Sequence, residues 1–109
     1  MAVPPPVLQI LIALAERERH GYAIMQDVAA RTDGKVRLGP GTLYGSIKRM
    51  LSDGLIEEID DRPDTGSDDV RRRYYRITPQ GRRLAIDEIA RLAKLVRQAR
   101  ASGLAPKNS

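Results

Sequence analysis

The apolar positions in the first part of the chain form one nearly unbroken run. Residues 7–15 are apolar except for Gln9, and the charged residues 16–19 end the run. A helix that is apolar on all sides has to be covered on all sides. We therefore expect a helix here, with one side against the domain core and the other against a second subunit.

A different pattern, with apolar residues three and four positions apart, runs through LGPGTLYGSIKRMLSDGLI at residues 38–56. Pro40 suits the first turn of a helix, because proline has no N–H to leave unpaired there, so the helix should begin at Gly39 or Pro40. Gly54 is placed to end it in the left-handed conformation. The spacing predicts a buried stripe of Leu43, Ile47, Met50 and Leu51.

The opposite side of this helix carries Thr42, Tyr44, Gly45, Lys48 and Arg49, with no carboxylate before Asp53. Such a face suits a major groove, because cations neutralise phosphates and side-chain donors reach phosphate oxygens or base edges. The alternative is an ordinary amphipathic surface helix.

Between these two stretches, His20-Gly21-Tyr22 breaks the first helix. A second helix is expected through about Arg31, with the Thr32-Asp33-Gly34 cluster ending it, and the alternation at residues 35–38 fits a very short strand. Two helices joined by a short connection, the second with a cationic face, make a helix-turn-helix.

Residues 55–61 and 70–77 are two runs suited to strands, separated by Pro, Gly, Ser and Asp residues, which predicts a hairpin with a long tip. A hairpin behind a helix-turn-helix is a wing. Residues 60–69 hold five Asp against one Arg, whereas residues 71–76 hold four Arg and no acid. Either the acidic tip neutralises the arginines, or the arginine strand contacts phosphates while the tip lies in solvent.

The last helix should start at Thr78-Pro79, with Thr as N-cap and Pro at the first helical position. Its apolar stripe, running to about residue 101, is too wide for one contact surface.

The seam of Ala85, Ile89, Leu92, Val96 and Ala99 in this last helix has coiled-coil spacing. We interpret this helix as a dimer arm that packs beside the first helix of its own chain or of the partner, where Leu8, Leu11 and Ile12 join the interface. The alternative is a single long helix that covers its own domain.

The expected fold class is therefore mainly α with a small β-hairpin: a winged helix-turn-helix plus a long C-terminal dimerisation helix. Its divisions are a proline-rich extended lead (1–6), a DNA-binding domain (7–78), the dimerisation helix (79–101) and a frayed tail (102–109).

Composition narrows the function classes. The chain has 109 residues, a net charge of +5 and a pI of about 10.0, which favours polyanionic partners. With no Cys and one His, disulfides, thiolate sites and an imidazole pair for a metal are excluded. No nucleophile pattern or phosphate-cradling glycine loop is present, so we expect neither an enzyme nor a cofactor. The apolar run at residues 7–15 is too short to span a bilayer and its flank is wrong for a signal peptide, so a cytoplasmic protein is expected.

Taken in order, the chain closely resembles the PadR family of winged-helix transcriptional regulators over roughly residues 5–100. The matching motifs are His20-Gly21-Tyr22, Pro40-Gly41-Thr42-Leu43-Tyr44, Asp53-Gly54-Leu55-Ile56, and Arg73-Tyr74-Tyr75-Arg76-Ile77-Thr78 with Gly81-Arg82. The resemblance implies a homodimer that inserts two recognition helices into successive major grooves of a palindromic operator. It also implies a repressor that a small hydrophobic or aromatic effector releases.

The residues expected to contact double-stranded DNA are Gly41, Thr42, Tyr44, Lys48, Arg49, Arg72, Tyr74 and Arg76. Tyr44 is expected to donate its hydroxyl to a phosphate, by the resemblance and by its open face; the alternative is that its ring packs under the hairpin. His20 is interpreted as a turn-closing residue, and Tyr22 and Tyr75 as core residues.

Two positions depart from the family pattern: Gly39 replaces a capping Ser, and Gly45 replaces the proline that usually follows the tyrosine. The chain also has no Trp, which disfavours a tryptophan-stacked drug site. The rival hypothesis is a protein-interaction module whose acidic tip repels DNA and whose last helix docks on another protein.

Overall fold

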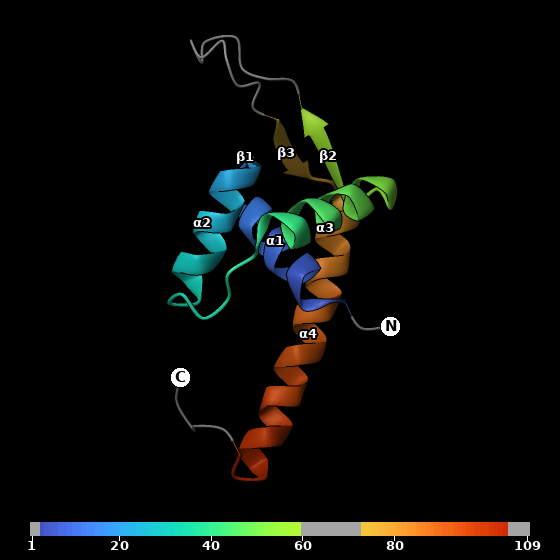
Figure 1. The fold of residues 1–109 in the computed structure, drawn as a ribbon. Coiled ribbons are helices and arrows are strands. Elements are labelled where there is room, and N and C mark those ends of the chain that lie inside the picture. Colours follow the sequence, from blue (N-terminus) through green and yellow to red (C-terminus); the bar gives the residue numbers. More distant parts are fainter. Residues whose placement is uncertain (1–2, 60–72, 105–109) are drawn as a thin grey trace.

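The computed structural model describes residues 3–59 and 73–104. The helices and strands follow one another as α1 (Pro5–Glu16), β1 (Arg19–His20), α2 (Gly21–Arg31), α3 (Pro40–Ser52), β2 (Ile56–Ile59), β3 (Tyr74–Ile77) and α4 (Pro79–Ala101). In Figure 1 the first three helices and the strands form one body, and α4 extends far beyond it. The expected fold class, mainly helical with a small β-sheet and a long last helix, is confirmed.

The first helix starts earlier than expected. Pro4 is the N-cap in extended conformation, and Pro5 and Pro6 already belong to α1, so the extended lead predicted for residues 1–6 is wrong at these two positions. Prolines are tolerated there because the first N–H groups of a helix have no intrahelical partner. The restriction that proline places on its predecessor is met by Pro4, whose ψ is 141°.

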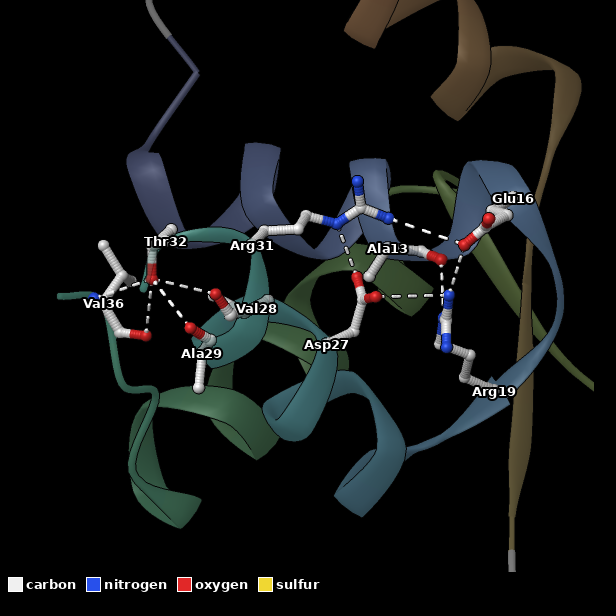
Figure 2. Close-up of polar contacts among 9 residues, drawn as sticks. All are labelled: Ala13, Glu16, Arg19, Asp27, Val28, Ala29, Arg31, Thr32 and Val36. Atoms are coloured by element: carbon white, nitrogen blue, oxygen red, sulfur yellow. Dashed lines mark hydrogen bonds and ion pairs between the residues drawn. The ribbon is translucent and has the colours of Figure 1, made fainter. Parts of the chain in front are cut away.

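Arginines and carboxylates join the end of α1 to α2 (Figure 2). Arg19 Nε donates to the backbone oxygen of Ala13 at 2.8 Å, and its Nη2 lies 2.7 Å from Glu16 and 3.4 Å from Asp27. Arg31 Nε donates to the same Asp27 at 2.6 Å. Because the Arg19 and Asp27 side chains are only 14% and 17% exposed, this cluster fixes the first two helices relative to each other.

The C-terminal end of α2 is closed as predicted, and Thr32 is the reason (Figure 2). Its hydroxyl donates to the Val28 oxygen at 2.9 Å and accepts from the Val36 N–H at 3.0 Å. Asp33 and Gly34 follow with φ of 55° and 78°. Two successive residues in the left-handed region reverse the chain toward α3.

The sheet has a third strand that the sequence did not reveal. Its strands are antiparallel in the order β1-β3-β2, with Ile56 opposite Ile77 and His20 opposite Tyr74. The two later strands are the expected wing, whose tip lies outside the described residues. Residues 35–38, where the alternation fitted a short strand, form none; the short strand is β1 instead.

The core lies between α1, α2, α3 and the sheet. Its fully or almost fully buried members are Val7, Ile10, Leu11, Ala13, Leu14, Ile24, Val28, Leu38, Leu43, Ile47, Met50, Leu55, Ile56 and Tyr75. Only Leu84 and Ala85 of α4 pack against this cluster. The core therefore belongs to the winged helix-turn-helix, and most of α4 does not cover it.

The start of α4 is anchored on the turn that follows α3. The Thr78 hydroxyl accepts from the Gly81 N–H at 3.0 Å, as expected of an N-cap, and donates to the Gly54 oxygen at 2.7 Å. A Cβ on Gly81 would collide with the backbone oxygen of Leu55. A glycine is therefore required for the close approach of α4 to this turn.

One charged residue of α4, Glu88, is buried at 6% exposure. Its two oxygens accept from Arg91 at 2.9 and 2.7 Å. The hydrogen bond from Arg91 is the main cause that lowers the pKa of Glu88, with a smaller contribution from the backbone of Val3. Glu88 thus lies near the segment that precedes α1. Among the described residues, no helix is both long and apolar enough to cross a membrane.

Candidate nucleic-acid interface

The face of α3 opposite the core is open, as the sequence predicted. Leu43, Ile47 and Met50 are buried and Leu51 is half-buried. The exposed residues are Gly41, Thr42, Tyr44, Gly45, Lys48 and Arg49. This helix therefore presents hydroxyl groups and cations on the surface while its apolar stripe fixes its orientation.

The two ends of α3 are built differently. At the C-terminal end, the Gly54 N–H donates to Leu51 and the Leu55 N–H to Met50, with Gly54 at a φ of 77°; this is a Schellman closure. At the N-terminal end, Gly39 offers no side-chain cap. The first-turn amides are consequently available to an anion, which the helix dipole also favours.

Among the described residues, the two cations of α3 lack a carboxylate partner, in contrast to Arg19 and Arg31 at the α1–α2 junction. Within residues 3–59 and 73–104, neither Lys48 nor Arg49 makes an ion pair with a carboxylate, although Asp53 lies one turn beyond Arg49. A cation without a carboxylate keeps its full charge for a ligand. These two residues therefore carry the electrostatic contribution of the face.

Tyr44 is held by a contact that neither earlier alternative described. A Cβ placed on Gly21 would lie 2.8 Å from Tyr44 Cζ and 3.0 Å from its Cε1, and would collide with the hydroxyl. The phenol ring thus rests on the glycine that opens α2, while the residue keeps 47% of its surface exposed. Tyr44 is neither a free surface side chain nor a buried one.

The sequence assigned roles to His20, Tyr22 and Tyr75, and the structure agrees with two of the three assignments. His20 caps α2, because its Nδ1 accepts from the Ala23 N–H at 3.2 Å, which fits its expected turn-closing role. Tyr75 is buried, as expected, and burial is the main cause that raises its pKa. Tyr22 is 61% exposed, so its placement in the core was wrong. It lies on the outer side of α2 with most of its surface exposed.

The described wing residues make ring contacts and ion pairs within the chain, whereas Lys48 and Arg49 of α3 make no ion pair in the described part of the chain. Tyr74 meets the His20 ring edge-on, with centroids 5.4 Å apart. Arg76 Nε lies 2.8 Å from Glu57, its Nη1 lies 4.0 Å from Glu18, and Arg73 lies 3.8 Å from Glu58. Among the described residues, Arg73 and Arg76 thus pair with Glu57 and Glu58 of β2 and with Glu18. Arg72 and the tip lie outside the described residues.

A pocket of about 590 Å³ opens along the flank of α3. Its apolar side is formed by Val3, Val7, Met50, Leu55 and Leu84, and its polar side includes Thr42, Ser46, Arg49 and Asp53. Arg49, Thr42 and Gly41 belong both to the pocket and to the predicted DNA-contacting set. No local sequence pattern indicates this pocket, because its lining joins the segment before α1 to α3 and α4.

From Ile86 onward, α4 exposes large apolar side chains. Ile86, Ile89, Leu95 and Val96 are 60%, 44%, 52% and 42% exposed. Among the residues expected in a dimer interface, Leu8, Ile12, Ala85, Leu92 and Ala99 are half-buried. Leu11 is fully buried in the core of its own chain, so it has no surface to offer a partner. The alternative that α4 covers its own domain does not hold for the four exposed residues.

Comparison with known proteins agrees with this architecture. The sequence profile of the transcriptional regulator PadR-like family matches residues 10–86. The transcriptional regulator Rv3488 of Mycobacterium tuberculosis is 37% identical over 94 residues, covering 77% of this chain and 78% of that protein. Two relatives from Streptomyces fradiae and Lysinibacillus sphaericus are each 35% identical, and the chain spans only 22% and 64% of their lengths.

Solved structures give the same fold. A transcriptional regulator from Clostridium thermocellum superposes with a TM-score of 0.73 at 26% identity, over 89% of this chain and 87% of that chain. Bacillus subtilis PadR, solved in complex with operator DNA, superposes with a TM-score of 0.67 at 19% identity, over 76% of this chain and 45% of that chain. On the sequence match and the fold together, the chain belongs to the PadR-like family of transcriptional regulators.

Proposed function

We propose that this chain is a sequence-specific DNA-binding transcriptional regulator that inserts α3 into the major groove. The observation that carries the proposal is the open α3 face, on which Lys48 and Arg49 have no ion-pair partner among the described residues. Membership of a regulator family supports it, as does the fold shared with a protein solved in complex with operator DNA.

Within this face the residues take different roles. The first-turn amides at Gly41 and Thr42 bind a phosphate, and the Tyr44 hydroxyl donates to another. Lys48 points into or along the groove, and Arg49 contacts the backbone laterally. Tyr74 and Arg76 are secondary contacts, because each already has a partner within the sheet or at its edge; Arg72 is assigned from the sequence alone.

We further infer that the protein acts as a homodimer on a palindromic operator. Exposed apolar residues that gather on one surface mark an interaction site. Helix α4 exposes Ile86, Ile89, Leu95 and Val96, and Figure 1 shows this helix extending beyond the body. Two copies joined along this face hold two α3 helices, and such pairs read half-sites about one helical turn apart.

Repression in the cytoplasm, relieved by a small apolar effector, completes the proposal. The pocket beside α3 supports it, since 590 Å³ lies within the usual size range of ligand sites. A ligand seated there contacts Thr42 and Arg49 and competes for them with DNA. Leu84→Trp would put the chain's first tryptophan in the pocket wall, so a change in its emission on adding apolar compounds measures occupancy.

The decisive experiment is selection of duplexes from a random pool, followed by titration of the selected duplex at several salt concentrations. We expect a palindromic sequence and an affinity that falls linearly on a log-log plot against salt. Indifference to every duplex at low ionic strength would reject DNA binding and favour the protein-interaction module.

The dimer is tested separately by sedimentation of Ile89→Asp with Leu92→Asp. Two buried carboxylates in an apolar seam are unfavourable, so we expect monomers and loss of tight operator binding. Gln98→Asp, an exposed change on the same helix, is the control and should remain dimeric. A dimer that survives the double substitution would refute the assignment of α4.

A further inference from the structure

Position 21 requires a glycine because a side chain would clash there, not because the backbone adopts an unusual conformation. It opens α2 and is buried, and its φ does not lie in the left-handed region. Alanine is ordinarily the better helix residue. The missing side chain matters here because the Tyr44 ring occupies the volume that a Cβ would need, with Cζ at 2.8 Å and Cε1 at 3.0 Å.

The backbone under the ring is held from two sides. Immediately before Gly21, His20 caps α2 through its Nδ1, and the strand pairing sets His20 opposite Tyr74. The rings of His20 and Tyr74 also meet edge-on at 5.4 Å. Gly21 therefore has a fixed position, at the point where β1, which pairs with β3, continues into α2.

We propose that Gly21 is a positioning residue for DNA binding: it forms the seat that sets where the Tyr44 phenol lies on the open face of α3. This inference rests on the proposed function and adds to it a buried residue that cannot reach DNA itself. The ring is then pre-positioned while 47% of the residue's surface stays exposed, so that less side-chain freedom is lost when its hydroxyl meets a phosphate.

The seat predicts that the effect of residue 21 depends on residue 44. Gly21→Ala should displace the ring and weaken operator binding about tenfold, as for one lost hydrogen bond to a charged group. Tyr44→Ala should weaken binding by a similar factor, because it removes the same hydroxyl. In the Tyr44→Ala background, Gly21→Ala should change affinity less than about twofold, since no ring remains to be displaced.

Two controls separate positioning from folding. Gly45→Ala adds a methyl where nothing lies within 4 Å, so it reports what a glycine-to-alanine change does to helix stability in the absence of a clash. Tyr22→Phe removes a hydroxyl from another exposed tyrosine and should leave operator affinity unchanged. All affinities are measured well below each variant's unfolding temperature, which is determined by circular dichroism.

The free protein gives a readout that does not depend on DNA. A ring stacked on Gly21 shifts the Hα resonances of that residue, and we expect Tyr44→Ala to return them toward ordinary glycine values. Equal losses of affinity from Gly21→Ala with and without the ring, or no loss in the wild-type background, would overturn the positioning role. If the wild type bound no duplex, the proposed function and this role would both fall, while unchanged Hα shifts in Tyr44→Ala would overturn the seat alone.

Discussion

The α1–α2 junction and the open face of α3 use the same kinds of side chain for opposite purposes. At the junction, Arg19 contacts a backbone oxygen and two carboxylates, and Thr32 bridges the end of α2 to the loop that follows (Figure 2). On α3, the cations Lys48 and Arg49 have no carboxylate partner in the described chain, and Thr42 is exposed.

The difference lies in desolvation and in partners. A half-buried arginine is favourable only when its donors are satisfied, because an unpaired charge away from water is costly. An exposed lysine without a partner costs little and remains available to a polyanion. Composition alone therefore does not separate the cations that stabilise the fold from those that remain available to a ligand; the pairing of each cation does.

The largest effect on the free energy of unfolding is expected at the α1–α2 junction. Arg19→Ala leaves the Ala13 oxygen without the Arg19 donor and removes one of the two arginines paired with Asp27, and we expect unfolding free energy to fall by about 2–3 kcal/mol. Urea denaturation measures this. Arg17→Ala is the matched control, since Arg17 is exposed two positions away with no ion pair in the described residues. If Arg19→Ala and Arg17→Ala lowered the unfolding free energy equally, the paired arginine would stabilise the fold no more than the exposed one.

The two threonines give a second matched pair. Thr32→Val keeps the shape of the side chain but leaves the Val36 N–H and the Val28 oxygen without the hydroxyl, so we expect a loss of about 1–2 kcal/mol. Thr42→Val should leave unfolding unchanged within about 0.5 kcal/mol. It should weaken DNA binding instead, because it removes a hydroxyl from the open face of α3 while keeping the backbone amide. Thermal unfolding and operator titration of both variants separate the two roles.

The carboxylate of α4 gives a pH-dependent effect. Because the Arg91 hydrogen bond lowers the pKa of Glu88 from 4.5, the folded state favours its ionised form. This contribution is fully present above pH 4.5 and is lost as pH falls through the lower folded-state pKa. Unfolding of the wild type should therefore depend on pH more steeply below this value than unfolding of Glu88→Gln. Asp87→Asn, an exposed neighbour, should retain the wild-type slope.

The smallest effect on stability is expected on α3. Lys48→Ala should leave unfolding within about 0.5 kcal/mol of the wild type. It should weaken operator and random DNA alike and lower the salt slope by about one unit, as loss of one phosphate contact requires. Lys94→Ala on the exposed side of α4 is the control. An unchanged slope in Lys48→Ala would contradict the contact.

The sequence by itself determined the helix ends and helix faces, which depend on residues close together in the chain. Apolar spacing placed the buried stripe of α3, Gly54 marked its end, and Thr78 with Pro79 marked the start of α4. These features follow from helix periodicity and from hydrogen bonds that reach only a few positions along the chain. The exposed face of α3 followed from the same periodicity.

Only the tertiary structure decided which residues meet across the chain. It paired the two-residue strand β1 with β3, left Tyr22 exposed, buried Leu11 in its own core and set Arg76 against Glu57. It also placed the Tyr44 ring on Gly21. No local pattern encodes these contacts, because each depends on how separate elements pack, and packing fixes which side chains lose their water and which keep it.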